Sequence, residues 1–298
     1  MSERESKEKH IPVLLEEVIA YLDPRVNEKV IDGTAGFGGH SQKILEKVGV
    51  NGKVLMIEWD PQVAEALREK FAVEIKQGRA VVENDNYAHL EAIARRHGFA
   101  PVEKILLDIG ISSFDIDQSG RGFTFQKDEP LDMRFSPDAP KSAYEIVNSY
   151  SEDDLEKVLR EYGEEKFARR IARMIVGQRK TKPITTTFEL AALIKKCLPG
   201  WKKDLGRSFQ AIRIEANQEL ANLKNVLPQA LEILPSGGRL AVISFHSLED
   251  RIVKNYFREL KDKGLAEILT KKPVTAGEKE ITANSRSGSA KMRVLQKI

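Results

Sequence analysis

Short runs of apolar residues alternate with helix-like stretches along the first 110 residues of the chain. The apolar runs are continuous, which is typical of strands that are buried on both faces. Between these runs, apolar residues recur at helical spacing. The predicted strands span 29–32, 53–58, 79–83 and 104–108, and the predicted helices span 41–48, 61–71 and 89–97. This order predicts an α/β fold in which helices cover both faces of a parallel sheet.

The alternation breaks after residue 108, and the next convincing core strand is 239–244. One crossover helix cannot fill so long a gap. Two further strands, 265–269 and 292–295, follow the fifth strand. The sheet is therefore predicted to continue after a large insertion.

Helix-start signals indicate that the insertion is helical. Ser151 is followed by acidic residues, and Thr186 precedes Glu189 by three positions, which is the pattern of a capping box. An apolar stripe over 208–227 predicts a long helix that leads back to the sheet. The predicted domains are a sheet domain of residues 1–111 and 208–298 and an inserted helical domain of residues 112–207.

The composition is that of a globular protein with a full core, because 41% of the 298 residues are hydrophobic and 31% are charged. No apolar run reaches the ~18 residues of a membrane span, and residues 1–9 carry no secretory signal. Cys197 is the single cysteine, which excludes an internal disulfide and favours a small buried hydrophobe at this position. We expect a cytoplasmic protein with no membrane partner and no metal site.

Positive charge gathers in one part of the chain. Between Lys157 and Arg207 there are 14 Lys or Arg against 5 Asp or Glu, although the whole chain has a net charge of only +3. Lys166, Arg170 and Arg173 share one helical stripe, and a second basic cluster, 179–182, follows. A polyanionic partner such as RNA fits this distribution. A solvated helix face that is balanced by acids elsewhere is the alternative.

The first predicted strand leads into a glycine-rich loop, 32–41, with glycines at 33, 36, 38 and 39. Glycines let a backbone turn tightly and approach a ligand closely. Position 41 is Ser41, so the loop lacks the third glycine of the full dinucleotide fingerprint. Glu58 ends the second strand, where an acid can accept the hydroxyls of an adenosine ribose. This feature suits NAD and S-adenosylmethionine equally.

Two further candidates follow the next strands. Tyr87 comes after the third strand, where its ring could cover an adenine. Asp108 ends the fourth strand, and a carboxylate that emerges from a buried strand is costly unless it is paired. We therefore expect Asp108 to lie at a ligand site.

Eight motifs occur along nearly the whole length of the chain. They are HIPVLL at 10–15, DGTAGFGGHS at 32–41, RGFTF at 121–125, PLDMR at 130–134, YGEE at 162–165, FARRIA at 167–172, FQAIRI at 209–214 and SFHSLEDR at 244–251. With these motifs the chain resembles the bacterial small-subunit ribosomal RNA cytosine-N4 methyltransferases of the MraW family. Each motif alone is weak, but all of them in this order are very specific.

The resemblance implies a Rossmann-like class I methyltransferase sheet, an inserted helical domain and S-adenosylmethionine as methyl donor. The implied substrate is a cytosine in the decoding centre of 16S ribosomal RNA, within the small ribosomal subunit. Whether the chain forms a homodimer is left open. The residues that would line the cofactor are Gly38, Gly39, His40, Glu58, Tyr87, Asp108 and Asp115.

Several positions depart from the family pattern. Family members usually carry Asp, Phe and Gln where this chain carries Glu58, Tyr87 and Asp115. The tail segment 284–289 also has one arginine fewer than the family's usual sequence. An anion at Asp115 changes the hydrogen bonding that is expected near the charged end of the cofactor.

The implied reaction is a direct displacement, in which the exocyclic amine of cytosine attacks the sulfonium methyl group. A hydrogen-bond acceptor for the amine N–H would localise the lone pair of this poor nucleophile. Asp108 is one candidate acceptor, and the loop after the fifth strand offers Ser244, His246 and Glu249. We take Asp108 and His246 as the candidate catalytic residues, although a structural hydrogen bond would equally explain His246.

Other functions remain open from the sequence. An NAD-dependent oxidoreductase would share the sheet and Glu58, but it would be expected to have the third loop glycine, which this chain lacks. A non-catalytic RNA-binding or assembly factor with a vestigial fold is a second alternative, and DNA as the substrate is a third.

Overall fold

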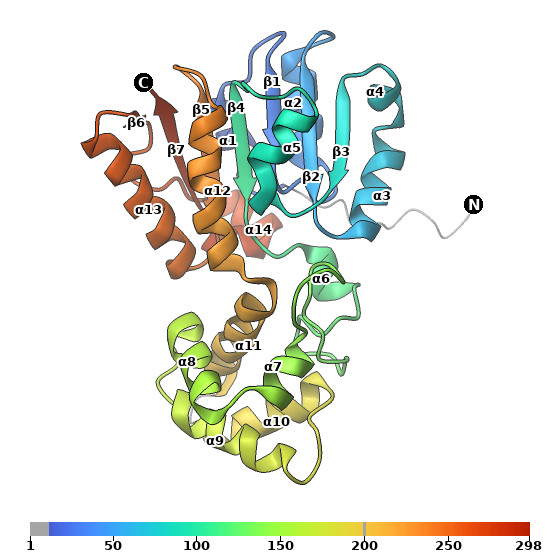
Figure 1. The fold of residues 1–298 in the computed structure, drawn as a ribbon, viewed down its shortest axis with the longest axis vertical. Helices are drawn as coiled ribbons and strands as arrows, with labels where there is room; N and C mark the ends of the chain where they lie inside the picture. Colours follow the sequence, from blue (N-terminus) through green and yellow to red (C-terminus); the bar gives the residue numbers. More distant parts are fainter. Residues whose placement is uncertain (1–11, 199–200) are drawn as a thin grey trace. The chain divides into compact units, whose positions relative to one another are not determined.

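The computed structural model describes residues 12–198 and 201–298, so His10 and Ile11 of the first motif lie outside the described residues. The chain forms two compact units (Figure 1). The first, here called the sheet unit, contains residues 1–110 and 222–298, and the second, the helical unit, contains residues 111–221. The second boundary lies at 221–222 rather than at 207–208, because the helix after residue 200 packs into the core of the helical unit.

The sheet unit is built on one seven-stranded sheet in the order β3-β2-β1-β4-β5-β7-β6. The strands are β1 (Lys29–Asp32), β2 (Lys53–Glu58), β3 (Ala80–Asn84), β4 (Lys104–Asp108), β5 (Arg239–Ser244), β6 (Ala266–Ile268) and β7 (Lys291–Lys297). The first five strands are parallel, whereas β7 runs antiparallel to both β5 and β6. All seven strands that the sequence predicts are therefore confirmed.

Helices cover both faces of this sheet. The helices of the sheet unit are α1 (Leu15–Leu22), α2 (Gly39–Val48), α3 (Pro61–Lys70), α4 (Ala72–Lys76), α5 (Leu90–Arg96), α12 (Glu219–Ile233), α13 (Ser247–Asp262) and α14 (Glu278–Ala283), with short 3-10 turns at Tyr87–His89 and Ser285–Ser289. The apolar faces of α5, α12 and α13 form one core with the sheet, in front of it in Figure 1. Those of α1, α2 and α3 form a second core on the opposite face.

The helical unit has a core of its own. Its helices are α6 (Ser113–Asp117), α7 (Ala143–Ser149), α8 (Glu152–Gly163), α9 (Ala168–Arg179), α10 (Thr187–Cys197) and α11 (Trp201–Asn217). The predicted caps are confirmed, because the hydroxyl of Ser151 accepts from the Asp154 N–H and Thr186 forms a capping box with Glu189. Cys197 is buried in this core as expected.

The single helix predicted over 208–227 is wrong. The chain forms α11 and α12 instead, and they are separated at Gln218, whose φ of 51° is left-handed and cannot continue a helix. The side-chain amide of Asn217 at the end of α11 donates to the Met133 carbonyl, and its oxygen accepts from the Phe135 N–H. These bonds tie the end of α11 to the loop of the helical unit.

Parallel strands bring their carboxyl ends to one edge of the sheet, here called the carboxyl edge. Asp32, Glu58, Asp108 and Ser244 are the last residues of β1, β2, β4 and β5. The β strands are short and their interiors are buried, so these polar ends are the first positions at which side chains can meet a ligand. None of the helices in the described part of the chain is long and apolar enough to span a bilayer.

Candidate functional site at the carboxyl edge

The glycine-rich loop is joined to the end of β2 by Glu58. One oxygen of its carboxylate accepts from the Gly36 N–H at 2.9 Å, and the other accepts from the Asp60 N–H at 2.8 Å. Gly36 has a φ of +52°, and a Cβ added there would meet nothing within 4 Å. A ligand can therefore approach the backbone at Gly36, next to a carboxylate whose position is fixed by two backbone donors.

Three predicted cofactor residues serve the packing of the loop itself. A Cβ on Gly38 would lie 2.4 Å from the ring of Phe71, and one on Gly39 would lie 2.3 Å from the ring of Pro12. His40 is buried, and its Nε2 lies 2.9 Å from the Val13 carbonyl oxygen. Because a carbonyl only accepts, Nε2 carries the hydrogen and donates it. Gly39 and His40 thus hold the segment that begins at Pro12 against the start of α2, whereas Gly38 packs against the end of α3.

Burial keeps His40 neutral. Desolvation lowers the pKa of its imidazole to about 4, although the bond to Val13 acts in the opposite direction. At neutral pH, Nδ1 is therefore a lone pair, and it lies 3.9 Å from Oδ2 of Asp108. That separation is too long for a hydrogen bond, and a neutral ring forms no ion pair. His40 gives Asp108 no compensating charge.

Asp108 is the most strongly perturbed group at this edge. Burial raises the pKa of its carboxyl to about 8, and the carboxylates of Asp32 and Glu249 add to the rise. Its Oδ1 is buried and has no hydrogen-bond partner among the described residues. Its backbone N–H donates to Thr34 Oγ1 at 2.6 Å, which fixes the end of β4 against the glycine-rich loop. Asp108 is thus a neutral acid at pH 7.

Asp32, on the strand next to that of Asp108, has a different protonation state. Burial raises the pKa of Asp32 to about 6, but hydrogen bonds, above all the 2.6 Å bond that the Ser41 hydroxyl donates, limit the rise. At pH 7 Asp32 is mostly ionised. Asp32 and Thr34 were not among the predicted site residues. Asp32 ends β1 just as Asp108 ends β4, and that shared position was the available signal.

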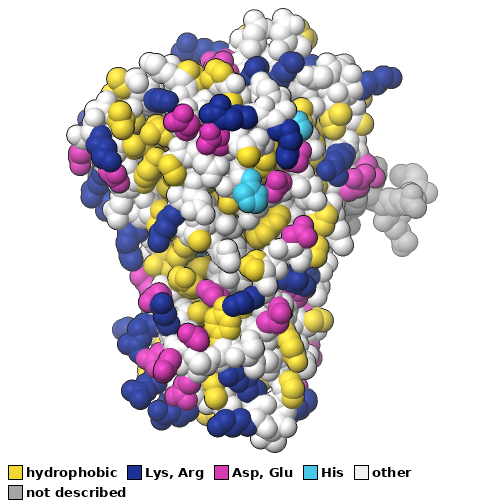
Figure 2. All heavy atoms as spheres, viewed as in Figure 1, with side chains coloured by type: hydrophobic (Ala, Val, Ile, Leu, Met, Phe, Trp, Pro, Cys, Tyr) yellow, Lys and Arg dark blue, Asp and Glu magenta, His cyan; other side chains and the backbone are white. Residues whose placement is uncertain are grey.

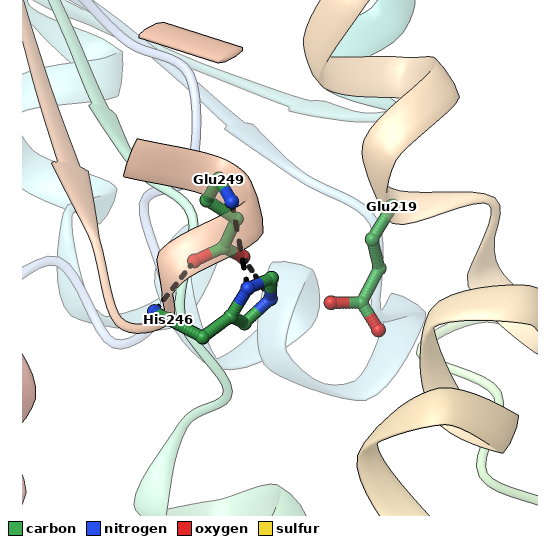
Figure 3. Close-up of side chains that lie close together, drawn as sticks. All are labelled: Glu219, His246 and Glu249. Atoms are coloured by element: carbon green, nitrogen blue, oxygen red, sulfur yellow. Dashed lines mark hydrogen bonds and ion pairs between the residues drawn. The ribbon is translucent and has the colours of Figure 1, made fainter. Parts of the chain in front are cut away.

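The loop after β5 places His246 and Glu249 in a helix cap (Figure 3). Glu249 Oε2 accepts from the N–H groups of Phe245 and His246, at 2.8 and 3.3 Å, and His246 Nδ1 accepts from the Glu249 N–H at 3.4 Å. This reciprocal box starts α13 at the carboxyl edge. Glu219, also drawn, belongs to the helical unit, where Arg213 Nε donates to it at 2.9 Å.

The remaining predicted cofactor residues lie in different units. Tyr87 is half-buried in the 3-10 turn after β3 and packs against the core that contains α5. Asp115 belongs to the helical unit, where its Oδ2 accepts from the Ser112 N–H at 3.0 Å and Arg121 lies 3.2 Å from its other oxygen. The anion at this position is therefore balanced by an arginine within its own unit.

The basic residues of the helical unit are only partly available to a partner. Figure 2 shows many Lys and Arg side chains over this unit, with Asp and Glu among them. Lys166 and Arg170 are exposed, but Arg173 pairs with Glu152 at 3.3 Å. Arg179 donates to the Val147 carbonyl at 2.7 Å and Lys182 pairs with Glu189 at 2.6 Å. Much of the predicted second cluster therefore stabilises the unit itself.

The sheet order, the glycine-rich first loop and the acids at the ends of β2 and β4 define a Rossmann-like class I methyltransferase core with an inserted helical unit. A model of the MraW methylase family matches residues 7–298. The chain therefore belongs to the MraW methylase family.

Individual relatives agree with this assignment. The chain is 43% identical to "Ribosomal RNA small subunit methyltransferase H" of Heliobacterium mobile, over 97% of this chain and 99% of that one. It is 44% identical to the protein of the same name from Caldicellulosiruptor saccharolyticus, again over 97% and 99%. Among solved structures, a putative methyltransferase from Streptococcus mutans in complex with SAH is similar, with a TM-score of 0.47 and 13% identity over 97% and 99% of the two chains.

The packing of Gly39 against Pro12 makes a first prediction. We expect Gly39→Ala to force the Pro12 ring away, to destabilise the protein by about 1–3 kcal/mol, and to speed hydrogen exchange of the amides in α1. Gly177→Ala is the matched control, because a Cβ there meets nothing within 4 Å and lies in a helix. Equal exchange rates in α1 for the two variants would contradict the packing role.

The raised pKa of Asp108 makes a prediction for stability. Its protonated form stabilises the fold below the ordinary pKa of 3.8, and this contribution is lost as the pH rises through about 8. Asp108→Asn removes the ionisation, so its melting temperature should exceed that of the wild type by roughly 2 °C or more at pH 8.5, and the gain should shrink toward pH 5. Exposed Asp138→Asn is the control. If the melting temperatures of the wild type and of Asp108→Asn change with pH in parallel, Asp108 does not have a raised pKa.

Proposed function

We propose that this chain transfers a methyl group from S-adenosylmethionine to the N4 exocyclic amine of a cytosine in the decoding centre of 16S ribosomal RNA, within the small ribosomal subunit. Membership of a methylase family supports the reaction class. The relatives that match nearly the whole chain are named small-subunit ribosomal RNA methyltransferases, which supports this RNA as the substrate. The cytoplasm is the proposed location.

The observation that carries the proposal is the buried Oδ1 atom of Asp108, which has no hydrogen-bond partner among the described residues. A buried polar atom without a partner is costly, so it is expected to meet one when the site is filled. The charged groups that act on Asp108 are the acids Asp32 and Glu249, which makes a cationic ligand the favoured partner. A sulfonium donor that also carries an ammonium group fits this requirement better than a nicotinamide cofactor, whose ring is cationic only when it is oxidised and whose pyrophosphate adds negative charge.

The residues of the carboxyl edge fit such a donor. Glu58 would accept the hydroxyls of its ribose, Tyr87 would cover its adenine, and the open backbone at Gly36 would allow close approach. Asp108 would face its charged end. When bound, the donor supplies an electrophilic methyl group on a positively charged sulfur.

The chain's own residues then act on the substrate amine. A cation near Asp108 favours its ionised form, and the resulting carboxylate can accept the amine N–H and hold the proton that the reaction releases. His246 and Glu249 fix the loop beside it, so we assign His246 a positioning role through the α13 cap. The target base must leave its stack to reach this edge. Exposed cations of the helical unit, Lys166 and Arg170 among them, would bind phosphates of the same RNA.

Mass mapping of ribosomal RNA nucleosides tests the proposed function. Cells that lack this gene should lose one methyl group from the N4 position of a single cytosine in the small-subunit RNA, and the gene should restore it. If every cytosine carries the same methyl groups in cells with and without the gene, the proposed substrate is contradicted. Loss of a methyl group elsewhere in the RNA would keep the enzyme class and overturn the N4 assignment.

The roles of Asp108 and His246 can be separated by purified variants. With the donor saturating, we expect Asp108→Asn to lower the rate constant for methyl transfer by about 10²–10⁴-fold, because the proton acceptor is lost. His246→Ala should lower it less and should also raise hydrogen exchange at the start of α13. Asp138→Asn should match the wild type. A wild-type rate for Asp108→Asn at saturating donor would contradict its proposed role.

A further inference from the structure

The last segment of the chain returns to the carboxyl edge beside the candidate site. Asp108 is level with Ile243 of β5, Ile243 with Met292 of β7, and Met292 with Val274 on the outer side of β7. These four residues form one row across the sheet unit. Strands lie about 4.7–4.9 Å apart, so Val274 lies about 14 Å along the edge from Asp108.

This segment is unusually basic for the sheet unit. From residue 271 to the C-terminus there are seven Lys or Arg against two Glu. Some of these cations are engaged: Arg293 pairs with Asp250 at 2.6 Å, and Lys297 donates to the carbonyls of Leu231 and Leu234. They hold β7 against its neighbours and are not available to a partner.

Four lysines of the segment are not used in this way. Lys271, Lys272 and Lys279 are exposed, and Lys291 is half-buried at the first position of β7, level with Ser244. In the described part of the chain, no carboxylate lies within ion-pair distance of these four side chains. Four lysines on one short segment that have no described ion-pair partner favour a polyanion as their partner.

Backbone hydrogen bonds hold this segment in place. Val274 and Met292 exchange backbone hydrogen bonds at 2.9 and 2.8 Å, so the chain that carries Lys271 and Lys272 is fixed to the outer side of β7. On the far side of this segment, Glu280 of α14 accepts from the Leu14 N–H at 2.8 Å. The lysines are therefore presented by a structured border of the sheet unit.

We propose that Lys271, Lys272, Lys279 and Lys291 form a second RNA-binding surface, here called the edge-lysine surface, which binds backbone phosphates next to the target nucleotide. The inference rests on the proposed function. A base that enters the carboxyl edge brings its flanking phosphates along this edge. Lysine suits this role, since its ammonium group binds phosphate as a point charge without base specificity. The edge-lysine surface belongs to the sheet unit and is independent of the cations in the helical unit.

The test compares two charge reversals in the full-length protein. Lys271→Glu with Lys272→Glu changes the edge-lysine surface. Lys53→Glu with Lys261→Glu makes the same change in net charge at two exposed lysines of the sheet unit, at the first position of β2 and near the end of α13, away from the carboxyl edge. Binding is measured with small ribosomal subunits and with 16S ribosomal RNA, both from cells that lack the modification, between about 50 and 200 mM salt.

We expect the edge-lysine variant to bind RNA roughly tenfold more weakly, with a salt dependence that is shallower by about two phosphate contacts. Its affinity for S-adenosylmethionine, measured by calorimetry, should equal that of the wild type. The control variant should change RNA affinity much less. An unchanged salt slope, or an equal loss in the control variant, would overturn the edge-lysine surface. Wild-type protein that binds neither RNA would instead overturn the proposed function, and this inference with it.

Discussion

Asp108 ends β4 with one buried carboxyl oxygen and with two other acids acting on it, and this constraint organises the site. A buried carboxyl near like charges gains stability by staying protonated, which is why its pKa lies near 8. The neighbouring imidazole of His40 cannot compensate it, because burial keeps that ring neutral as well. The fold therefore keeps a buried polar atom without a described partner at the carboxyl edge, which costs free energy. A cationic ligand would reduce this cost.

The surrounding residues preserve this arrangement. Thr34 fixes the backbone of Asp108, and Glu58 fixes the glycine-rich loop against β2. The Pro12 ring and the Val13 carbonyl fasten the start of α2, so the loop is braced from a segment that is distant in the sequence. The cap formed by His246 and Glu249 fixes the loop after β5 and brings a further acid near Asp108. Packing thus fixes the loops that surround Asp108, and electrostatics sets the protonation of its carboxyl.

The strand-end residues were predictable from the sequence, because a polar residue at the end of an apolar strand in a parallel sheet must lie at the carboxyl edge. Glu58 and Asp108 were identified in this way. The packing roles of Gly39 and His40 were not, since they depend on contacts with Pro12 and Val13 that no local pattern encodes. The break at Gln218 was missed for a related reason: the apolar stripe continues through it, and only the backbone conformation separates α11 from α12.

The most direct test of the account is the titration of the Asp108 carboxyl carbon, observed by NMR in selectively labelled protein with and without S-adenosylmethionine. The account predicts a midpoint near pH 8 in the free protein, and a midpoint well below 7 once the sulfonium donor is bound. A midpoint near 4 in the free protein, or one that the donor leaves unchanged, would contradict it.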